Sequence, residues 1–137
     1  MRRIMILAGA AALAALPAFA LAAGINPLAE LDALFKGRAP EAPVDCVQLR
    51  GSYGLRIVGG TTIIIRHRNG LIYRSDPAGG CPFQSGSYQL ATNPSDVRLC
   101  KGDPVGVVDV QRGVQIGACD VGQWTPYRRI SDKAFNP

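Results

Sequence analysis

The sequence predicts an all-β fold, a small antiparallel barrel or sandwich with two disulfides, preceded by a signal peptide and a short tether. Two stretches have the pattern of β-hairpins, and many short β-rich runs are separated by Gly, Pro, Asn and Asp, which is typical of small β domains. Four cysteines follow an apolar leader, so disulfides can support the limited core of a small exported domain.

Residues 1–20 have the pattern of a secretory signal peptide. Met1-Arg2-Arg3 gives a positive start, residues 4–16 are apolar or small, and Ala18-Phe19-Ala20 matches an A-x-A cleavage site. Cleavage after Ala22 fits the same pattern. The apolar run is too short to span a membrane comfortably. We therefore predict no stable membrane span after cleavage and a periplasmic or secreted location.

The exported part is modestly basic. Removing Arg2 and Arg3 from the 15 Lys and Arg leaves 13, against 10 Asp and Glu, which gives a net charge of about +3. This charge favours loose attraction to anionic envelope surfaces. A nucleic-acid binder needs a basic stripe with stacking aromatics, so nucleic acid is not an expected partner.

Residues 21–43 are expected to form a flexible tether. Within it, residues 27–35 are a candidate short helix, which would be marginal in isolation. The β domain is expected at 44–130 and a tail at 131–137. The strands are expected at 47–50, 55–58, 61–68, 71–75, 88–91, 97–100, 105–110, 114–119 and 124–130.

The first hairpin runs from Thr61 to Asp76. A two-residue loop at Asn69-Gly70 would mix charged side chains into its apolar face. A three-residue loop at 68–70 keeps the apolar side chains together, with Gly70 in the left-handed position of a G1 bulge. A one-residue slip exchanges the faces, so burial selects the second register. That register pairs His67 with Leu71, Ile65 with Tyr73 and Ile63 with Ser75.

The second hairpin is expected to turn at residues 111–113, again through a three-residue loop. A two-residue loop would set Asp109 against Ile116. The expected register pairs Val110 with Val114, Val108 with Ile116 and Gly106 with Ala118.

The four cysteines form an even set in an exported chain, so two disulfides are expected. A zinc site is disfavoured, because the spacings contain no C-x-x-C pair and only one histidine is available. Three connectivities are open. We prefer Cys46–Cys119, which would tie the first and last strands, together with Cys81–Cys100.

Several motifs together resemble a family of small exported bacterial proteins known only as a domain of unknown function. The resemblance covers Cys46 to Tyr127 and implies export and a β-rich, cysteine-bearing module, without an activity, a substrate or a catalytic residue. The motifs are Cys46-x-x-Leu49-Arg50, the Thr62–Tyr73 hairpin, Cys81-Pro82, Leu99-Cys100-x-Gly102-Asp103, Gly117-x-Cys119 and Thr125-Pro126-Tyr127.

Two short segments, Ser85-Gly86-Ser87-Tyr88 and Lys101-Gly102-Asp103, are similar to segments of membrane-bound and periplasmic inhibitors of C-type lysozyme. Those inhibitors are small disulfide-bearing β-barrels, and the resemblance implies that Ser85 and Lys101 enter the enzyme cleft. The spacing from Ser-Gly to Tyr is one residue shorter here than in that family, and Cys100 occupies a position where it has a polar or aromatic residue.

The sequence does not have the pattern of an active site. His67 is the only histidine and has no Ser, Cys or Asp partner near it in the chain, so we expect it at the hairpin end, hydrogen-bonded to a neighbour. The aspartates mostly occupy turns, with Asp103 as an example. We predict no catalytic, cofactor-binding or metal-binding residues, and we do not expect an enzyme.

Three arginines, Arg66, Arg68 and Arg74, are expected on one face of the first hairpin, where Arg56 can join them. They form either a solvated face that deters aggregation or a patch that holds a carboxylate or phosphate by bidentate hydrogen bonds. A second aromatic and basic group, in which the tryptophan is expected to close the core, comprises Trp124, Tyr127, Arg128 and Arg129.

These observations predict a non-enzymatic binding or accessory module of the cell envelope, with an envelope protein or an anionic glycan as partner. Its candidate binding residues are Arg66, Arg68, Arg74, Ser85 and Lys101. Two alternatives stay open. One is an inhibitor of C-type lysozyme or another hydrolase, and the other is a structural envelope protein.

Overall fold

The computed structural model describes residues 26–81 and 88–133. The predicted signal peptide and Ser85 lie outside this part of the chain. The described residues form antiparallel sheets with little helix, which confirms the all-β class. The helices are α1 (Pro27–Phe35) and α2 (Ile130–Lys133). The strands are β1 (Arg38–Pro40), β2 (Cys46–Gln48), β3 (Ser52–Val58), β4 (Thr62–His67), β5 (Ile72–Ser75), β6 (Tyr88–Ala91), β7 (Arg98–Cys100), β8 (Pro104–Asp109), β9 (Val114–Asp120) and β10 (Trp124–Arg129).

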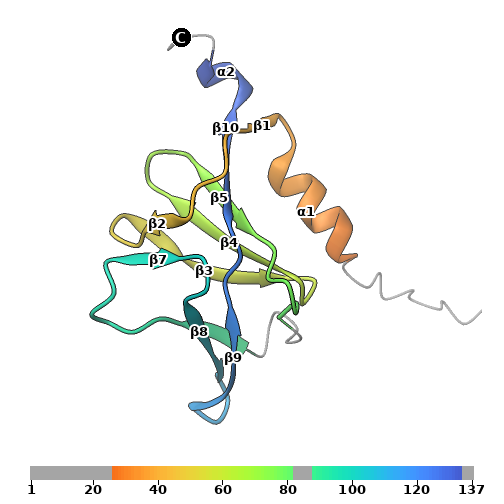
Figure 1. Cartoon of the computed structure of the whole chain (residues 1–137). Coiled ribbons are helices and arrows are strands. Elements are labelled where there is room, and N and C mark those ends of the chain that lie inside the picture. The colour runs from red at the N-terminus through yellow and green to blue at the C-terminus, as the bar shows by residue number, and fades with distance from the viewer. Residues whose placement is uncertain (1–25, 82–87, 134–137) are drawn as a thin grey trace, which may run out of the picture.

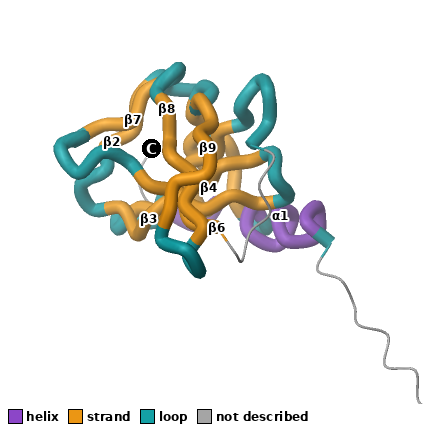
Figure 2. Tube along the Cα trace, turned by 90° about the horizontal axis from the view of Figure 1, so that it is seen from below, coloured by secondary structure: helices purple, strands orange, loops and turns teal. Residues whose placement is uncertain are grey.

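The strands form three antiparallel sheets. The largest has the order β1-β10-β5-β4-β3, and the smaller ones are β2-β7 and β6-β8-β9. None of these described sheets closes into a barrel, so the barrel alternative is wrong. The β2–β7 pair and α1 lie on opposite sides of the molecule in both views (Figures 1 and 2).

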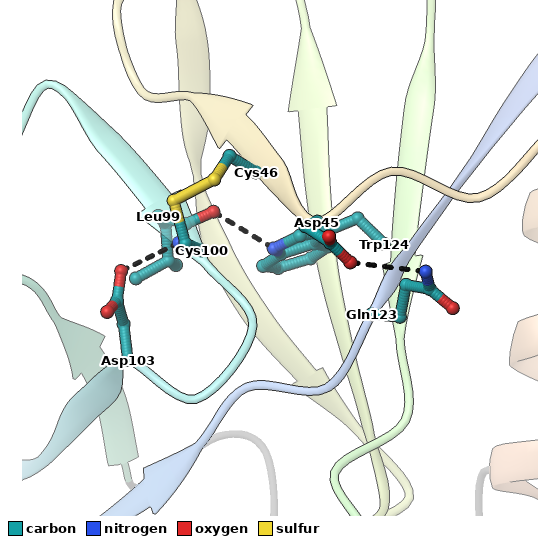
Figure 3. Close-up of a disulfide and its surroundings, with 7 residues drawn as sticks. All are labelled: Asp45, Cys46, Leu99, Cys100, Asp103, Gln123 and Trp124. Atoms are coloured by element: carbon teal, nitrogen blue, oxygen red, sulfur yellow. Dashed lines mark hydrogen bonds between the residues drawn. A yellow bond between two sulfur atoms is a disulfide. The ribbon is translucent and has the colours of Figure 1, made fainter.

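The main core lies between the inner face of the five-stranded sheet and the two smaller sheets. Trp124 of β10 is fully buried there, as predicted, and its Nε1 donates to the carbonyl oxygen of Leu99 in β7 at 3.1 Å (Figure 3). This bond links two sheets and satisfies the polar end of the indole. The buried cluster comprises Val47, Ile57, Ile63, Ile65, Cys81, Leu90, Leu99, Val105, Val107, Cys119, Val121 and Trp124.

The outer face of the five-stranded sheet is covered by α1. The helix begins with an N-cap, in which the side chain of Asn26 accepts a hydrogen bond from the amide of Leu28 at 3.0 Å. Its central Leu31 is buried, and Leu34 and Phe35 pack beside it. The sheet contributes Val58, Ile64 and Ile72 to this second cluster.

The expectation of a flexible tether at 21–43 is corrected from Asn26 onward. The ring of Phe35 lies 4.2 Å from that of Tyr127, measured between centroids, and β1 pairs with β10. A helix this short is marginal alone, but burial of its apolar side against the sheet stabilises it. The folded domain therefore begins before the expected boundary at residue 44.

The first hairpin has the predicted register. Ile63 lies opposite Ser75 and Ile65 opposite Tyr73, while the amide of His67 donates to the Leu71 carbonyl oxygen at 3.0 Å. Gly70 has a φ of 84°, the left-handed conformation that the three-residue loop requires. Each predicted strand has a counterpart among β2 to β10.

The second hairpin departs from the predicted register near its turn. Gly106 lies opposite Ala118 as expected, but Val108 pairs with Gln115 and Asp109 with Val114. The carboxylate of Asp109 accepts hydrogen bonds from the amides of residues 111 and 112, which stabilises a longer turn. The register shifts between Val107 and Val108, which leaves the extra residue of the bulge on β9.

The disulfide pairing differs from the one we preferred. Two disulfides form, as predicted, but they join Cys46 to Cys100 and Cys81 to Cys119. The reason is strand order, because β2 pairs with β7 and this places Cys46 directly opposite Cys100 (Figure 3). The last strand of the domain is β10, whereas Cys119 lies on β9, in the core cluster that also holds Cys81.

Candidate functional site

A groove of about 670 Å³ lies beside the C-terminal end of α1 and the turn between β4 and β5. Its volume is in the range of small-molecule sites. The residues that line it are Ala33, Leu34, Lys36, Gly37, Arg38, Tyr53, Arg66, His67, Gly70, Leu71, Ile72, Arg129 and Ser131. We call it the cationic groove, because the described residues that line it include a lysine and three arginines but no Asp or Glu.

The cationic groove crosses the five-stranded sheet from one edge to the other. In the order of the sheet, each strand contributes a lining residue, namely Arg38, Arg129, Ile72, Arg66 and Tyr53. Adjacent strands lie about 4.8 Å apart, so the groove extends for about 19 Å across the sheet. It is therefore elongated across the strands.

Two arginines of the groove lie directly opposite each other on neighbouring strands, Arg38 on β1 and Arg129 on β10. Like charges in this position destabilise a sheet. Nη1 of Arg38 donates to the carbonyl oxygen of Gly70 at 2.8 Å and to that of Tyr127 at 3.3 Å. Arg38 thus joins β1 to the β4–β5 turn while it keeps its positive charge at the groove.

Three further arginines of the sheet, Arg56, Arg74 and Arg128, have carboxylate partners. Arg56 forms an ion pair with Glu30 of α1. Nε of Arg128 donates to Oε1 of Glu41 at 2.7 Å. These pairs hold α1 and the segment after β1 against the sheet.

The positive charge of Arg74 is likewise paired with a carboxylate. Its Nε donates to Oδ2 of Asp76 at 2.8 Å, and its guanidinium carbon lies 5.9 Å from the centroid of the Phe35 ring. The hydrogen bond to Asp76 raises the pKa of Arg74 above its ordinary value, against the opposing effect of partial burial. By contrast, no hydrogen bond or ion pair joins the side chains of Lys36, Arg66 or Arg129 to any described residue.

Tyr53 stands at the β3 end of the cationic groove with 72% of its surface exposed. It lies in an irregularity of β3, where the pairing with β4 shifts between Ser52 and Leu55 and Gly54 has a φ of 96°. Such bulges redirect side chains and are common beside functional sites. Tyr53 and Arg66 also line a second hollow of about 230 Å³, which continues toward Arg56.

His67 lines the groove but is held by the backbone. Its Nε2 lies 2.9 Å from the carbonyl oxygen of Arg50, which can only accept, so Nε2 carries the proton. Its Nδ1 accepts from the amide of Asn69 at 3.5 Å. Both ring nitrogens are thus occupied, as the prediction of a neighbour-bonded histidine requires. Asp103 is likewise a turn residue, with its carboxylate accepting from the Cys100 amide at 2.7 Å.

The structure separates the candidate binding residues. Arg66 and Arg74 lie on the same face, opposite Ile72 and Ile64 respectively, but only Arg66 lines the cationic groove. Arg68 is exposed in the turn and does not line it. Lys101 is exposed in a turn after β7 and lines a different hollow of about 460 Å³. Ser85 lies outside the described residues.

Sequence reasoning missed Lys36, Arg38 and Tyr53 as parts of one site. Arg129 was noted, but together with Trp124 rather than with Arg66. The sequence does contain a local signal for this site, namely the basic segment Lys36-Gly37-Arg38 directly after the candidate helix. Its position beside Arg66 depends on the pairing of β1 with β10, for which the sequence has no local pattern.

Two further features bear on function. Within residues 26–81 and 88–133, no group of three or more His, Cys, Asp and Glu side chains is arranged to hold a metal ion. No helix among these residues is long and apolar enough to cross a membrane.

Comparison of the chain with protein-family models, with curated proteins and with solved structures found no match. The resemblances to small exported proteins and to lysozyme inhibitors therefore stay predictions.

Proposed function

We propose that this protein is an exported, non-enzymatic binding module of the cell envelope, and that the cationic groove holds an anionic group of its ligand. The observation that carries the proposal is the lining of the groove, in which the described residues supply four cationic side chains and no carboxylate. The opposed pair Arg38 and Arg129 supports it, because like charges are retained there at a cost to the sheet.

Export is supported by the two disulfides, which suggest an oxidising compartment outside the cytoplasm. Together with the leader pattern at residues 1–20, they support the finer proposal of a periplasmic or secreted protein.

Guanidinium groups favour carboxylate and phosphate ligands, because their planar donors match two acceptor oxygens at once. Arg66 and Arg129 approach the groove from different strands, so a ligand with separated anionic groups can contact both. A single small anion would leave part of the positive charge unmatched.

The test is retention of soluble envelope material on the immobilised, oxidised protein, followed by elution with salt. We expect Arg66→Gln to lose most of the anionic material that the native protein retains. Arg68→Gln is the matched control, since Arg68 is an exposed arginine two residues away that does not line the groove. Equal retention by all three proteins would exclude the groove and favour a structural envelope protein.

Inhibition of a lysozyme or another hydrolase would use a separate surface, the exposed turn at Lys101. If that alternative holds, Lys101→Ala abolishes inhibition of C-type lysozyme without unfolding the protein, and Arg66→Gln leaves inhibition intact. An absence of inhibition by the native protein would remove this alternative.

A further inference from the structure

We infer that the ligand of the cationic groove is an acidic polysaccharide with carboxylate-bearing sugar rings, and that Tyr53 forms a stacking platform for one of those rings. This inference rests on the proposed function and specifies the ligand class. Three observations carry it, namely the course of the groove, the presentation of Tyr53 and the charges around the rim.

The course of the groove favours a polymer. Its lining takes a residue from every strand of the five-stranded sheet, so it extends for about 19 Å perpendicular to the strands. Tyr53 and Arg66 also belong to the adjoining hollow, so the surface continues beyond the first groove. A chain of several sugar units can lie along such a path, whereas a monosaccharide would occupy one part of it.

The spacing of the cations favours repeated negative charge. In the order of the sheet, Arg38 and Arg129 lie on the first two strands. Ile72 lies on the third strand and Arg66 on the fourth, so an apolar side chain separates Arg66 from the other two arginines. Sugar rings with carboxylates at intervals present the same alternation of charge and apolar C–H surface. Each carboxylate can accept charge-assisted hydrogen bonds from a guanidinium.

The presentation of Tyr53 favours a ring. An exposed aromatic residue is informative when it lies beside polar binding groups. Here the bulge at Ser52 to Leu55 places Tyr53 at the rim of the groove with 72% of its surface free. A sugar ring can stack its C–H face on the phenol while its carboxylate reaches Arg66 on the neighbouring strand.

Other polyanions fit less well. An extended acidic peptide usually gains affinity by pairing with a strand edge, but the groove runs across the face of the sheet. An anionic bilayer favours a uniformly basic and projecting surface. Around this groove, Glu30 and Asp76 neutralise Arg56 and Arg74, and the remaining cations lie in a depression.

The experiment is titration of the full-length oxidised protein by calorimetry with a tetramer of 1,4-linked galacturonate. Monomeric galacturonate, a tetramer of 1,4-linked glucose, hexaglutamate and phosphatidylglycerol vesicles serve as comparison ligands. We expect the uronate tetramer to bind most tightly, the monomer at least tenfold more weakly and the glucose tetramer not at all.

Variants then assign the contacts. We expect Tyr53→Ala to lower affinity for the uronate tetramer about tenfold, with Tyr53→Phe close to the native protein because the ring is retained. Arg66→Gln lowers affinity and weakens its salt dependence, whereas Arg68→Gln changes neither.

The inference is overturned if the monomer binds as well as the tetramer, if Tyr53→Ala binds normally, or if hexaglutamate or vesicles bind more tightly. If the uronate tetramer fails while Arg66→Gln still abolishes retention of envelope material, the ligand class is wrong and the proposed function stands. If that retention is also unaffected, both are wrong.

Discussion

Two sets of basic side chains lie around the five-stranded sheet, and they differ in their counter-charges. Arg56, Arg74 and Arg128 each have a carboxylate partner from another segment or from the same hairpin. Lys36 and Arg66 line a groove to which the described part of the chain contributes no carboxylate. The chain thus has acidic residues beside the sheet, and they compensate the first set, whereas no described carboxylate pairs with Lys36 or Arg66.

We propose that this difference separates structural charge from charge that serves a ligand. A compensated arginine contributes to docking of its segment, although exposed pairs contribute little energy. An uncompensated cluster repels itself and lowers stability until an anion binds. The two sets should therefore respond in opposite ways to substitution, which Arg74→Gln and Arg129→Gln test.

The largest effect is expected when α1, which forms one wall of the groove, loses its main anchor. Leu31 is 8% exposed and packs on Ile64 and Ile72. Replacing it with alanine should lower the free energy of unfolding by about 2 to 3 kcal/mol, since a buried leucine is truncated. Ligand affinity should also fall because the wall is loosened. Urea denaturation and calorimetry measure the two effects.

Leu28→Ala provides the control for this variant. It removes the same number of carbons from the same helix, but Leu28 is 68% exposed. We expect little change in stability or affinity. Equal losses from Leu28→Ala and Leu31→Ala would contradict the docked position of α1.

A smaller effect is expected for a compensated arginine. Arg74→Gln removes the ion pair with Asp76, whose side chains are 33% and 53% exposed, so solvent screening limits the loss of stability to about 0.5 kcal/mol. The raised pKa of Arg74 means that its contribution persists below the ordinary arginine pKa and disappears only as pH rises beyond it. Stability measured across the neutral range should therefore show no pH dependence from this pair.

Ligand affinity should be unchanged in Arg74→Gln, because Arg74 does not line the groove. A loss of affinity comparable to that in Arg66→Gln would show that the two sets of charges are not separate. High salt should reduce the stability difference between the native protein and Arg74→Gln.

The sequence predicted the hairpins and strands well, because their information is local. The three-residue turn ending at Gly70 and the alternation of apolar residues determine which of Ile63, Ile64 and Ile65 face inward. The predicted register of the second turn was wrong because the carboxylate of Asp109 accepts hydrogen bonds from two backbone amides of the turn. Such a side-chain cap overrides the pattern of the strands.

The disulfide pairing and the groove could not be predicted, because they depend on which strands become neighbours. Cys46 meets Cys100 only through the pairing of β2 with β7. Arg129 approaches Arg66 only because β10 lies beside β5, which in turn lies beside β4. Pairings between distant segments leave no signature in either segment alone, so the sequence indicated basic residues without grouping them.

The smallest stability effect, and the sharpest contrast, is expected at Arg129. It lies directly opposite Arg38, so Arg129→Gln removes a repulsion and should raise the free energy of unfolding by about 0.2 to 0.5 kcal/mol. The same variant should bind an anionic ligand less tightly, because a donor of the groove is lost. Opposite signs for stability and affinity are the behaviour expected of a side chain kept for binding rather than for folding. If Arg129→Gln instead destabilises the protein as Arg74→Gln does, then Arg129 contributes to folding. The distinction between the two sets of charges would then fail at this position.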